Sequence, residues 1–118
     1  MPNFPYTLAG PDEQILVLEC PPFLDHASAD ELRAEAIRLL PDRDGAGLVL
    51  DMSGCHLVTS IGIAALLQID EFCSDRSAPF CLTNIEQPID ELLGMLNLTR
   101  KFTICSDREE AVDWAATL

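Results

Sequence analysis

The sequence predicts an α/β fold in which helices cover a mostly parallel sheet. Short continuous apolar runs, typical of strands buried on both faces, alternate along the chain with segments of helical apolar periodicity. Two strand-like segments come first, and helices and strands then alternate in the order β-β-α-β-α-β-α-β-α. Strands separated by helices pair in parallel through right-handed crossovers. Because 118 residues is a common size for one domain, we expect residues 1–118 to form a single domain.

The first half of this order begins with a predicted hairpin. Phe4 to Leu8 alternates apolar and polar residues before a Gly-Pro turn, and Ile15 to Leu18 is a continuous apolar run. Ser28 and Glu31 form a capping-box pattern at the start of a helix. The apolar face of that helix comprises Ala29, Leu32, Ala36, Leu39 and Leu40.

The second half begins with a buried strand, Leu48 to Leu50, which runs into Asp51. A helix is expected to begin near Ser60 and another near Pro88, with Asn97 in a left-handed conformation at the end of the second one. Strands are expected at Pro79 to Thr83, before the helix near Pro88, and at Phe102 to Cys105, after it. A final helix follows a capping box of Ser106 and Glu109.

The charge of the chain excludes several classes of partner. Its 20 acidic and 7 basic residues give a net charge of −13, which repels nucleic acid and anionic lipid headgroups. No apolar stretch is long enough to span a bilayer, and the first residues lack the pattern of a secretion signal, so we expect a cytoplasmic protein. Its five cysteines are odd in number and contain no C-x-x-C pair, which indicates reduced core thiols.

The residues that commonly carry catalysis or bind metal occur without their usual partners. His26 and His56 have no second His or Cys at ligand spacing, and Cys55 lies in no nucleophile-elbow motif. Gly62 belongs to no phosphate-binding glycine motif. We therefore predict no metal, no cofactor and no enzymatic activity. Asp51, at a strand end, is expected to accept backbone hydrogen bonds from its loop.

Functional sites of parallel sheets favour the loops at the carboxyl ends of the strands, which here are residues 20–26 and 51–60. The run from Leu48 to Gly62 resembles the central motif of STAS domains, in which a hydrophobic strand and an Asp precede the sequence D-S-S-G at a helix start. Thr59 aligns with the motif Asp, Ser60 with the first Ser and Ile61 with the second. Phe23-Leu24-Asp25 and the last third of the chain resemble other regions of the family.

The resemblance is to the anti-sigma-factor antagonists of this family, and it implies a STAS-like fold and a partner-switching function. In these proteins the first Ser of the motif is phosphorylated by a kinase that is itself the anti-sigma factor, which implies Ser60 here. The unphosphorylated protein would bind that anti-sigma factor, and a serine phosphatase would reset the switch. The implied partner-binding residues are Asp25, Thr59, Ser60, Ile61, Gly62 and Ile63.

The chemistry of a helix start leaves two roles open for Ser60. It either caps the helix, or it carries a phosphate that the positive end of the helix tolerates and that repels a partner from Ile61 and Ile63. Thr59 is an alternative phosphoacceptor, but a capping or packing role is favoured for it. Asp25 is either a cap beside Ser28 or part of the partner surface.

A second function is open as well. The family motif usually has a carboxylate at Thr59, a hydroxyl residue at Ile61 and a Gly-Glu pair at Pro22-Phe23. These departures favour a non-switching accessory or scaffold STAS subunit, for example of a lipid-transport ATPase complex.

Overall fold

The computed structural model describes residues 4–118 and confirms the predicted α/β architecture. The helices of this range are α1 (His26–Leu39), α2 (Ser60–Asp75), α3 (Gln87–Met95) and α4 (Arg108–Ala116). Its strands are β1 (Tyr6–Ala9), β2 (Ile15–Glu19), β3 (Phe23–Leu24), β4 (Gly47–Asp51), β5 (Leu57–Val58), β6 (Phe80–Thr83) and β7 (Thr103–Cys105).

The main sheet has the strand order β1-β2-β4-β6-β7 within the described range. β1 and β2 form the predicted antiparallel hairpin, with Tyr6 opposite Leu18, and all later pairs are parallel. The short strands β3 and β5 pair with each other in parallel and form a separate small sheet. The predicted order omitted them because two-residue strands show no periodicity.

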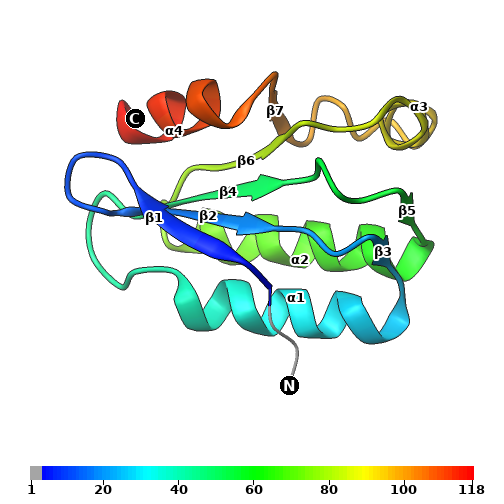
Figure 1. Ribbon diagram of the computed structural model, residues 1–118, viewed down its shortest axis with the longest axis horizontal. Helices are drawn as coiled ribbons and strands as arrows, with labels where there is room; N and C mark the ends of the chain where they lie inside the picture. Colours follow the sequence, from blue (N-terminus) through cyan, green and yellow to red (C-terminus); the bar gives the residue numbers. More distant parts are fainter. Residues whose placement is uncertain (1–3) are drawn as a thin grey trace.

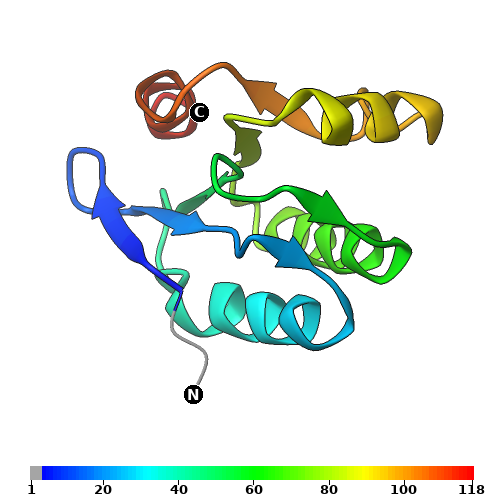
Figure 2. The same cartoon turned by 45° about the vertical axis from the view of Figure 1, so that its right-hand side comes forward.

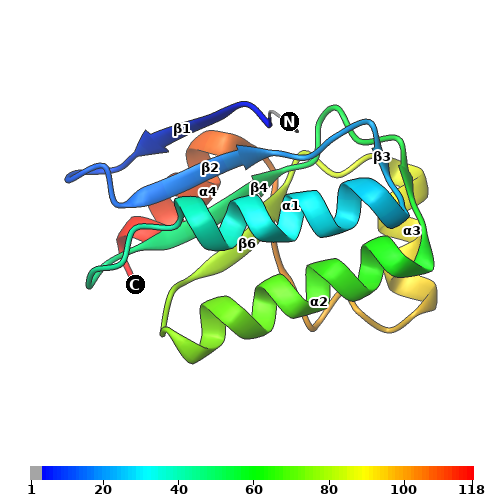
Figure 3. The ribbon, with the colours of Figure 1, turned by 90° about the horizontal axis from the view of Figure 1, so that it is seen from below.

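Two layers of helices enclose the main sheet (Figure 1). Helices α1 and α2 lie side by side across one face, as Figure 3 shows from below, and α4 covers the other face. Side chains alternate between the two layers along each strand: Leu48 and Leu50 belong to the core under α1 and α2, whereas Val49 belongs to the smaller core under α4. β4, at the middle of the sheet, is buried along its whole length.

The start of α1 differs from the prediction. Asp25 is the N-cap, and its Oδ1 accepts a hydrogen bond of 3.3 Å from the backbone N–H of Ser28. The Ser28 hydroxyl in turn accepts one of 3.0 Å from the backbone N–H of Asp25. The predicted box of Ser28 and Glu31 is therefore wrong, because Ser28 acts as the third helical residue of an earlier box that contains the stronger carboxylate acceptor.

The start of α4 also differs. Asp107, and not Ser106, is the N-cap, since its Oδ1 accepts a hydrogen bond of 2.8 Å from the backbone N–H of Glu110. The Ser106 hydroxyl instead donates to the Glu110 carboxylate. The predicted box with Glu109 is therefore wrong by one position. A carboxylate next to a serine competes for the cap position, and sequence spacing does not decide between them.

Two other local predictions, on Asn97 and on the cysteines, are confirmed. Asn97, which follows α3, has a φ of 59°, the left-handed conformation expected of it. The five cysteines, all within the described range, are free and buried. No helix of residues 4–118 combines the length and the apolar character that crossing a bilayer requires.

Candidate functional site

The small sheet of β3 and β5 brings the two predicted functional loops together (Figure 2). Leu24 of β3 is in register with Val58 of β5. The residues that follow these two strands, Asp25 and Thr59, therefore lie beside each other. Thr59 joins the loops directly: its backbone N–H and its Oγ1 both donate to the carbonyl oxygen of Leu24, at 3.0 Å and 3.2 Å. The starts of α1 and α2 thus form one surface at this end of the molecule.

Thr59 is the N-cap of α2. Its Oγ1 accepts a hydrogen bond of 3.2 Å from the backbone N–H of Gly62, which confirms the expected capping role. Ser60 is consequently the first helical residue rather than the cap, so the capping interpretation of Ser60 is wrong. Its side chain is exposed and takes no part in the Thr59 cap.

Gly62 and Ile63 lie on the inner face of α2. A Cβ atom on Gly62 would stand 2.5 Å from the carbonyl oxygen of Leu24 and 2.8 Å from Cγ1 of Val58, so only glycine allows this close approach. Ile63 is buried in the core under α1 and α2. Both residues therefore pack inward and offer a partner little surface, and the predicted partner-binding role of Gly62 and Ile63 stays a prediction.

Three apolar side chains at this end of the molecule, one next to Ser60 in the chain and two on the small sheet, are exposed instead. Phe23, Leu57 and Ile61 are 56%, 52% and 47% exposed, and we call these three residues the apolar rim. Phe23 and Leu57 are in register on β3 and β5. Ile61 was predicted to face a partner, whereas Phe23 and Leu57 were missed as site residues. Each precedes a buried residue in a strand too short to show which side faces solvent.

Asp25 contributes a negative charge to the same surface. Hydrogen bonds from the backbone N–H and the hydroxyl of Ser28 lower the pKa of Asp25, and its side chain is exposed. The carboxylate is therefore ionised at neutral pH. The capping role of Asp25 is confirmed, and its contact with a partner stays a prediction.

Comparison with known proteins identifies the family. The sequence model of the STAS domain matches residues 9–111. The chain belongs to the STAS domain family. No individual curated protein matches this chain by sequence.

Solved structures share the fold at low sequence identity. An anti-sigma-factor antagonist STAS domain protein from Planctomyces limnophilus has 16% identity and a TM-score of 0.82, over 98% of this chain and 99% of that one. The Bacillus cell fate determinant SpoIIAA in its phosphorylated form has 17% identity and a TM-score of 0.69, over 95% and 98%. The murine anion transporter Slc26a9 has 21% identity and a TM-score of 0.73, over 89% of this chain and 18% of the transporter.

Asp51 has a structural role at the carboxyl end of β4 in this STAS domain. As expected, its Oδ1 accepts a backbone hydrogen bond from Ser53, at 2.9 Å. Its Oδ2 also accepts from Nη2 and Nε of Arg108, at 2.7 Å and 3.1 Å, and Asn84 donates to Oδ1 at 3.2 Å. Burial alone would raise the pKa of Asp51, but these hydrogen bonds outweigh it and lower the pKa. Asp51 thereby joins the sheet to α4.

The histidine that follows Cys55 in the STAS motif loop has a carboxylate partner. His56 Nδ1 lies 2.8 Å from Oε1 of Glu86, the residue before α3. This contact connects the loop before β5 to the start of α3. Within residues 4–118, no three His, Cys, Asp or Glu side chains are grouped so as to hold a metal ion.

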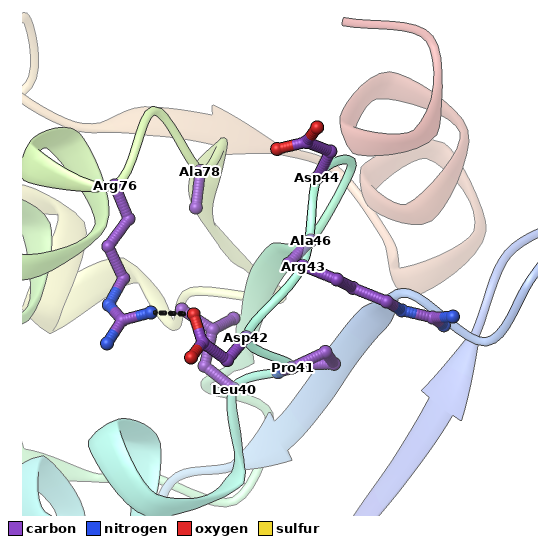
Figure 4. A pocket seen from close by; sticks show the side chains of 8 residues that line it. All are labelled: Leu40, Pro41, Asp42, Arg43, Asp44, Ala46, Arg76 and Ala78. Carbon is purple, nitrogen blue, oxygen red and sulfur yellow. Dashed lines mark hydrogen bonds and ion pairs between the residues drawn. The ribbon is translucent and has the colours of Figure 1, made fainter.

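A pocket of about 340 Å³ lies at the opposite end of the STAS domain (Figure 4). Ala46 and Ala78, which line it, come just before β4 and β6, so the pocket is at the amino ends of these strands. Arg76 and Asp42 form an ion pair of 2.9 Å in it, whereas the side chain of Arg43 points away. Ser60 is at the other end of the sheet, so this pocket is not part of the predicted site.

Proposed function

We propose that this STAS domain is an anti-sigma-factor antagonist that changes partners when Ser60 is phosphorylated. The unphosphorylated protein binds an anti-sigma factor with serine kinase activity, phosphorylation by that kinase releases it, and a serine phosphatase restores it. The protein acts by binding and not as an enzyme. The observation that carries the proposal is the exposure of Ser60 as the first residue of α2, next to the exposed Ile61 of the apolar rim.

The position of Ser60 suits a phosphate. A phosphoserine carries about −1.5 to −2 charges at neutral pH, and the start of a helix offers unpaired backbone N–H groups and the positive end of the helix dipole. The cap of α2 is made by Thr59, so modification of Ser60 leaves that hydrogen bond in place. The fold therefore accepts the phosphate.

The same phosphate opposes binding. The apolar rim offers a partner three side chains that are each about half exposed, and association would remove them from water. A dianion on Ser60, next to Ile61, would have to lose its hydration, at a cost that apolar contacts do not offset. Asp25 adds a second negative charge next to Thr59. The expected effect of phosphorylation is loss of binding without unfolding.

The test is intact-mass analysis after incubation with ATP and the serine kinase encoded by a neighbouring gene. The wild type should gain one phosphate and Ser60→Ala none. Ser74→Ala is the matched control, because it removes an exposed serine hydroxyl from the same helix, α2, but leaves the start of that helix unchanged. It should be phosphorylated like the wild type. Absence of phosphate on the wild type, or phosphate retained by Ser60→Ala, refutes the switch.

A second candidate is an accessory or scaffold STAS subunit, for example of a lipid-transport ATPase complex. It is supported by the neutral Thr59, where the family motif has a carboxylate, and by the likeness in fold to part of an anion transporter. In this role Ser60 need not be modified. Purification of native complexes separates the candidates: a transporter ATPase as partner supports the accessory role, and a soluble kinase supports the switch.

A further inference from the structure

β7 is an open edge of the main sheet. It pairs in parallel with β6 on one side, with Ile104 opposite Leu82, and no strand of residues 4–118 pairs with its other side. Beyond this pairing, no backbone hydrogen bond within the same range reaches Thr103, Ile104 or Cys105. An edge strand of this kind leaves the N–H and C=O groups of its outer side free to pair with another chain.

The residues of β7 lack most of the features that block such an edge. Natural edge strands commonly carry a charged side chain, a proline or a bulge, or are very short. Thr103, Ile104 and Cys105 are uncharged, and their register with β6 is continuous. The strand is short, however, with three residues. An added strand therefore needs contacts besides its backbone hydrogen bonds.

A groove beside this edge supplies such contacts. Two pockets of about 690 Å³ and 350 Å³ share the half-buried side chain of Trp114 on α4. Cys105 lines the larger pocket and Thr103 the smaller one, so the groove follows β7 along its length. The smaller pocket also reaches Asp70 of α2. A strand added to β7 would thus lie between α4 and α2, which cover opposite faces of the sheet (Figure 1).

The α4 side of the groove is acidic. Four exposed carboxylates line the larger pocket, namely Asp107, Glu109, Glu110 and Asp113. None of the four has an ion-pair partner among the described residues, and no Lys or Arg of that range lines this pocket. A concave surface of one sign of charge attracts side chains of the other sign. This side of the groove therefore suits lysine or arginine.

The other face of β7 is apolar. Ile104 is in register with Leu82, whose side chain belongs to the core under α1 and α2, so Ile104 points to the α2 side of the sheet. It is 37% exposed, although it lies within a strand. Side chains of an added strand would alternate between these two surroundings, with the carboxylates of α4 on one face and Ile104 on the other.

We propose that the β7 edge binds an extended segment of a basic partner protein, which adds a strand to the sheet. Lysine or arginine at every second position meets the carboxylates of α4, and apolar side chains between them pack on Ile104. A second copy of this chain is a poorer occupant. It has a net charge of −13, and pairing two β7 edges would bring two acidic α4 helices together. The proposal does not depend on phosphorylation of Ser60.

The probe is a synthetic peptide of about six residues, the usual length of a strand, that alternates lysine and valine. Trp114 is the one tryptophan of the chain, so its fluorescence reports binding in the groove. Titration of the full-length protein should shift the Trp114 emission until it saturates, whereas a peptide that alternates glutamate and valine should leave it unchanged. Amide chemical-shift changes measured by NMR should centre on β7 and α4.

A double variant tests the charge contacts. Glu110→Gln with Asp113→Asn should weaken binding of the lysine peptide by roughly 3- to 20-fold, the range for loss of two exposed ion pairs. Glu31→Gln with Glu71→Gln is the matched control, since it removes the same charge from exposed residues that line neither pocket. The control should weaken binding by less than about twofold, because salt screens distant charges. Equal losses in the two variants would mean that net charge alone causes binding, and they overturn the proposal.

Two further peptides test the addition of a strand. One carries N-methyl groups on its lysines and the other on its valines, so each keeps its charge but loses the N–H groups on one side of the extended chain. Because only one side of an added strand faces β7, one peptide should lose binding and the other should keep it. Equal affinities of these two peptides contradict strand addition.

Other results also overturn the proposal. They are an unshifted Trp114 emission with the lysine peptide, equal binding of the glutamate peptide, and chemical-shift changes at β1 or at the apolar rim instead of β7. Sedimentation of the free protein decides on the remaining occupant. It should show a monomer, whereas a dimer whose β7 amides are protected from hydrogen exchange would assign this edge to a second copy of the chain.

Discussion

Gly62 shows how one residue sets the distance between two elements. Because it has no side chain, the first turn of α2 can lie close to β3. A Cβ atom at this position would stand only 2.5 Å from the carbonyl oxygen of Leu24. The STAS motif resemblance marked this glycine without a physical reason. The structure supplies one: the candidate site exists because α2 and β3 lie this close.

Gly62→Ala should lower the free energy of unfolding by about 1 to 3 kcal/mol, the usual cost of forcing an extra methyl group into a packed contact. Gly94→Ala is the matched control, since it also lies in a helix but its Cβ would meet nothing within 4 Å. That variant should be neutral or more stable, by about 0.5 to 1 kcal/mol. Urea unfolding of both measures the difference, and equal effects would contradict this explanation.

Thr59 and Ser60 show where sequence reasoning about single residues stops. Both have hydroxyl groups that can cap a helix, and the local sequence does not decide between them. The choice comes from Leu24, 35 residues away, whose carbonyl oxygen accepts both the N–H and the hydroxyl of Thr59. Because Thr59 is held there, Ser60 is left as an exposed first residue of α2.

At the scale of elements, Asp51 and Arg108 join the sheet to α4. The pair connects residues that are 57 positions apart, so no local pattern predicted it. A hydrogen bond from the backbone of the following loop was predicted, and Ser53 donates it. Asp51 is nearly buried, at 4% exposure. A buried carboxylate with several donors stabilises a fold, because loss of its charge leaves those donors poorly satisfied.

Asp51→Asn should lower the free energy of unfolding at neutral pH by about 1 to 3 kcal/mol. Because the pKa of Asp51 is lowered in the folded state, its contribution is complete above the unfolded value of about 3.9 and disappears as the pH falls through the folded value. The difference between variant and wild type should therefore shrink below about pH 4. Urea unfolding at several pH values measures it.

Asp42→Asn provides the comparison for that experiment. Asp42 pairs with Arg76 at 2.9 Å, but its side chain is 91% exposed, so the loss should be at most about 1 kcal/mol. A difference at Asp51 that does not change with pH would show that packing, and not charge, causes the effect.

At the scale of the whole molecule, the net charge of −13 acts over the entire fold. The molecule measures 34 × 31 × 24 Å. The Debye length is about 30 Å at 0.01 M salt and about 8 Å at 0.15 M, so in dilute salt acidic groups on opposite sides still repel one another. Self-repulsion of this kind destabilises a compact state.

The melting temperature should therefore rise by a few degrees when salt is increased from about 0.01 M to about 0.15 M. Sodium and potassium chloride should act alike, because screening depends on ionic strength and not on the identity of the cation. Thermal unfolding followed by circular dichroism measures the change. A melting temperature that stays constant or falls would mean that the acidic groups do not repel one another appreciably in the fold.

The sequence by itself determined the order of the main helices and strands, the hairpin and the buried β4, since periodicity depends on neighbouring residues. It left two candidates, Thr59 and Ser60, for the cap of α2. Only the tertiary structure decided that Phe23 and Leu57 are exposed and that Gly62 and Ile63 are buried. The burial of these side chains depends on which distant segments of the chain pack against one another. Two-residue strands such as β3 and β5 are held by their partners rather than by their own pattern, so only the folded chain reveals them.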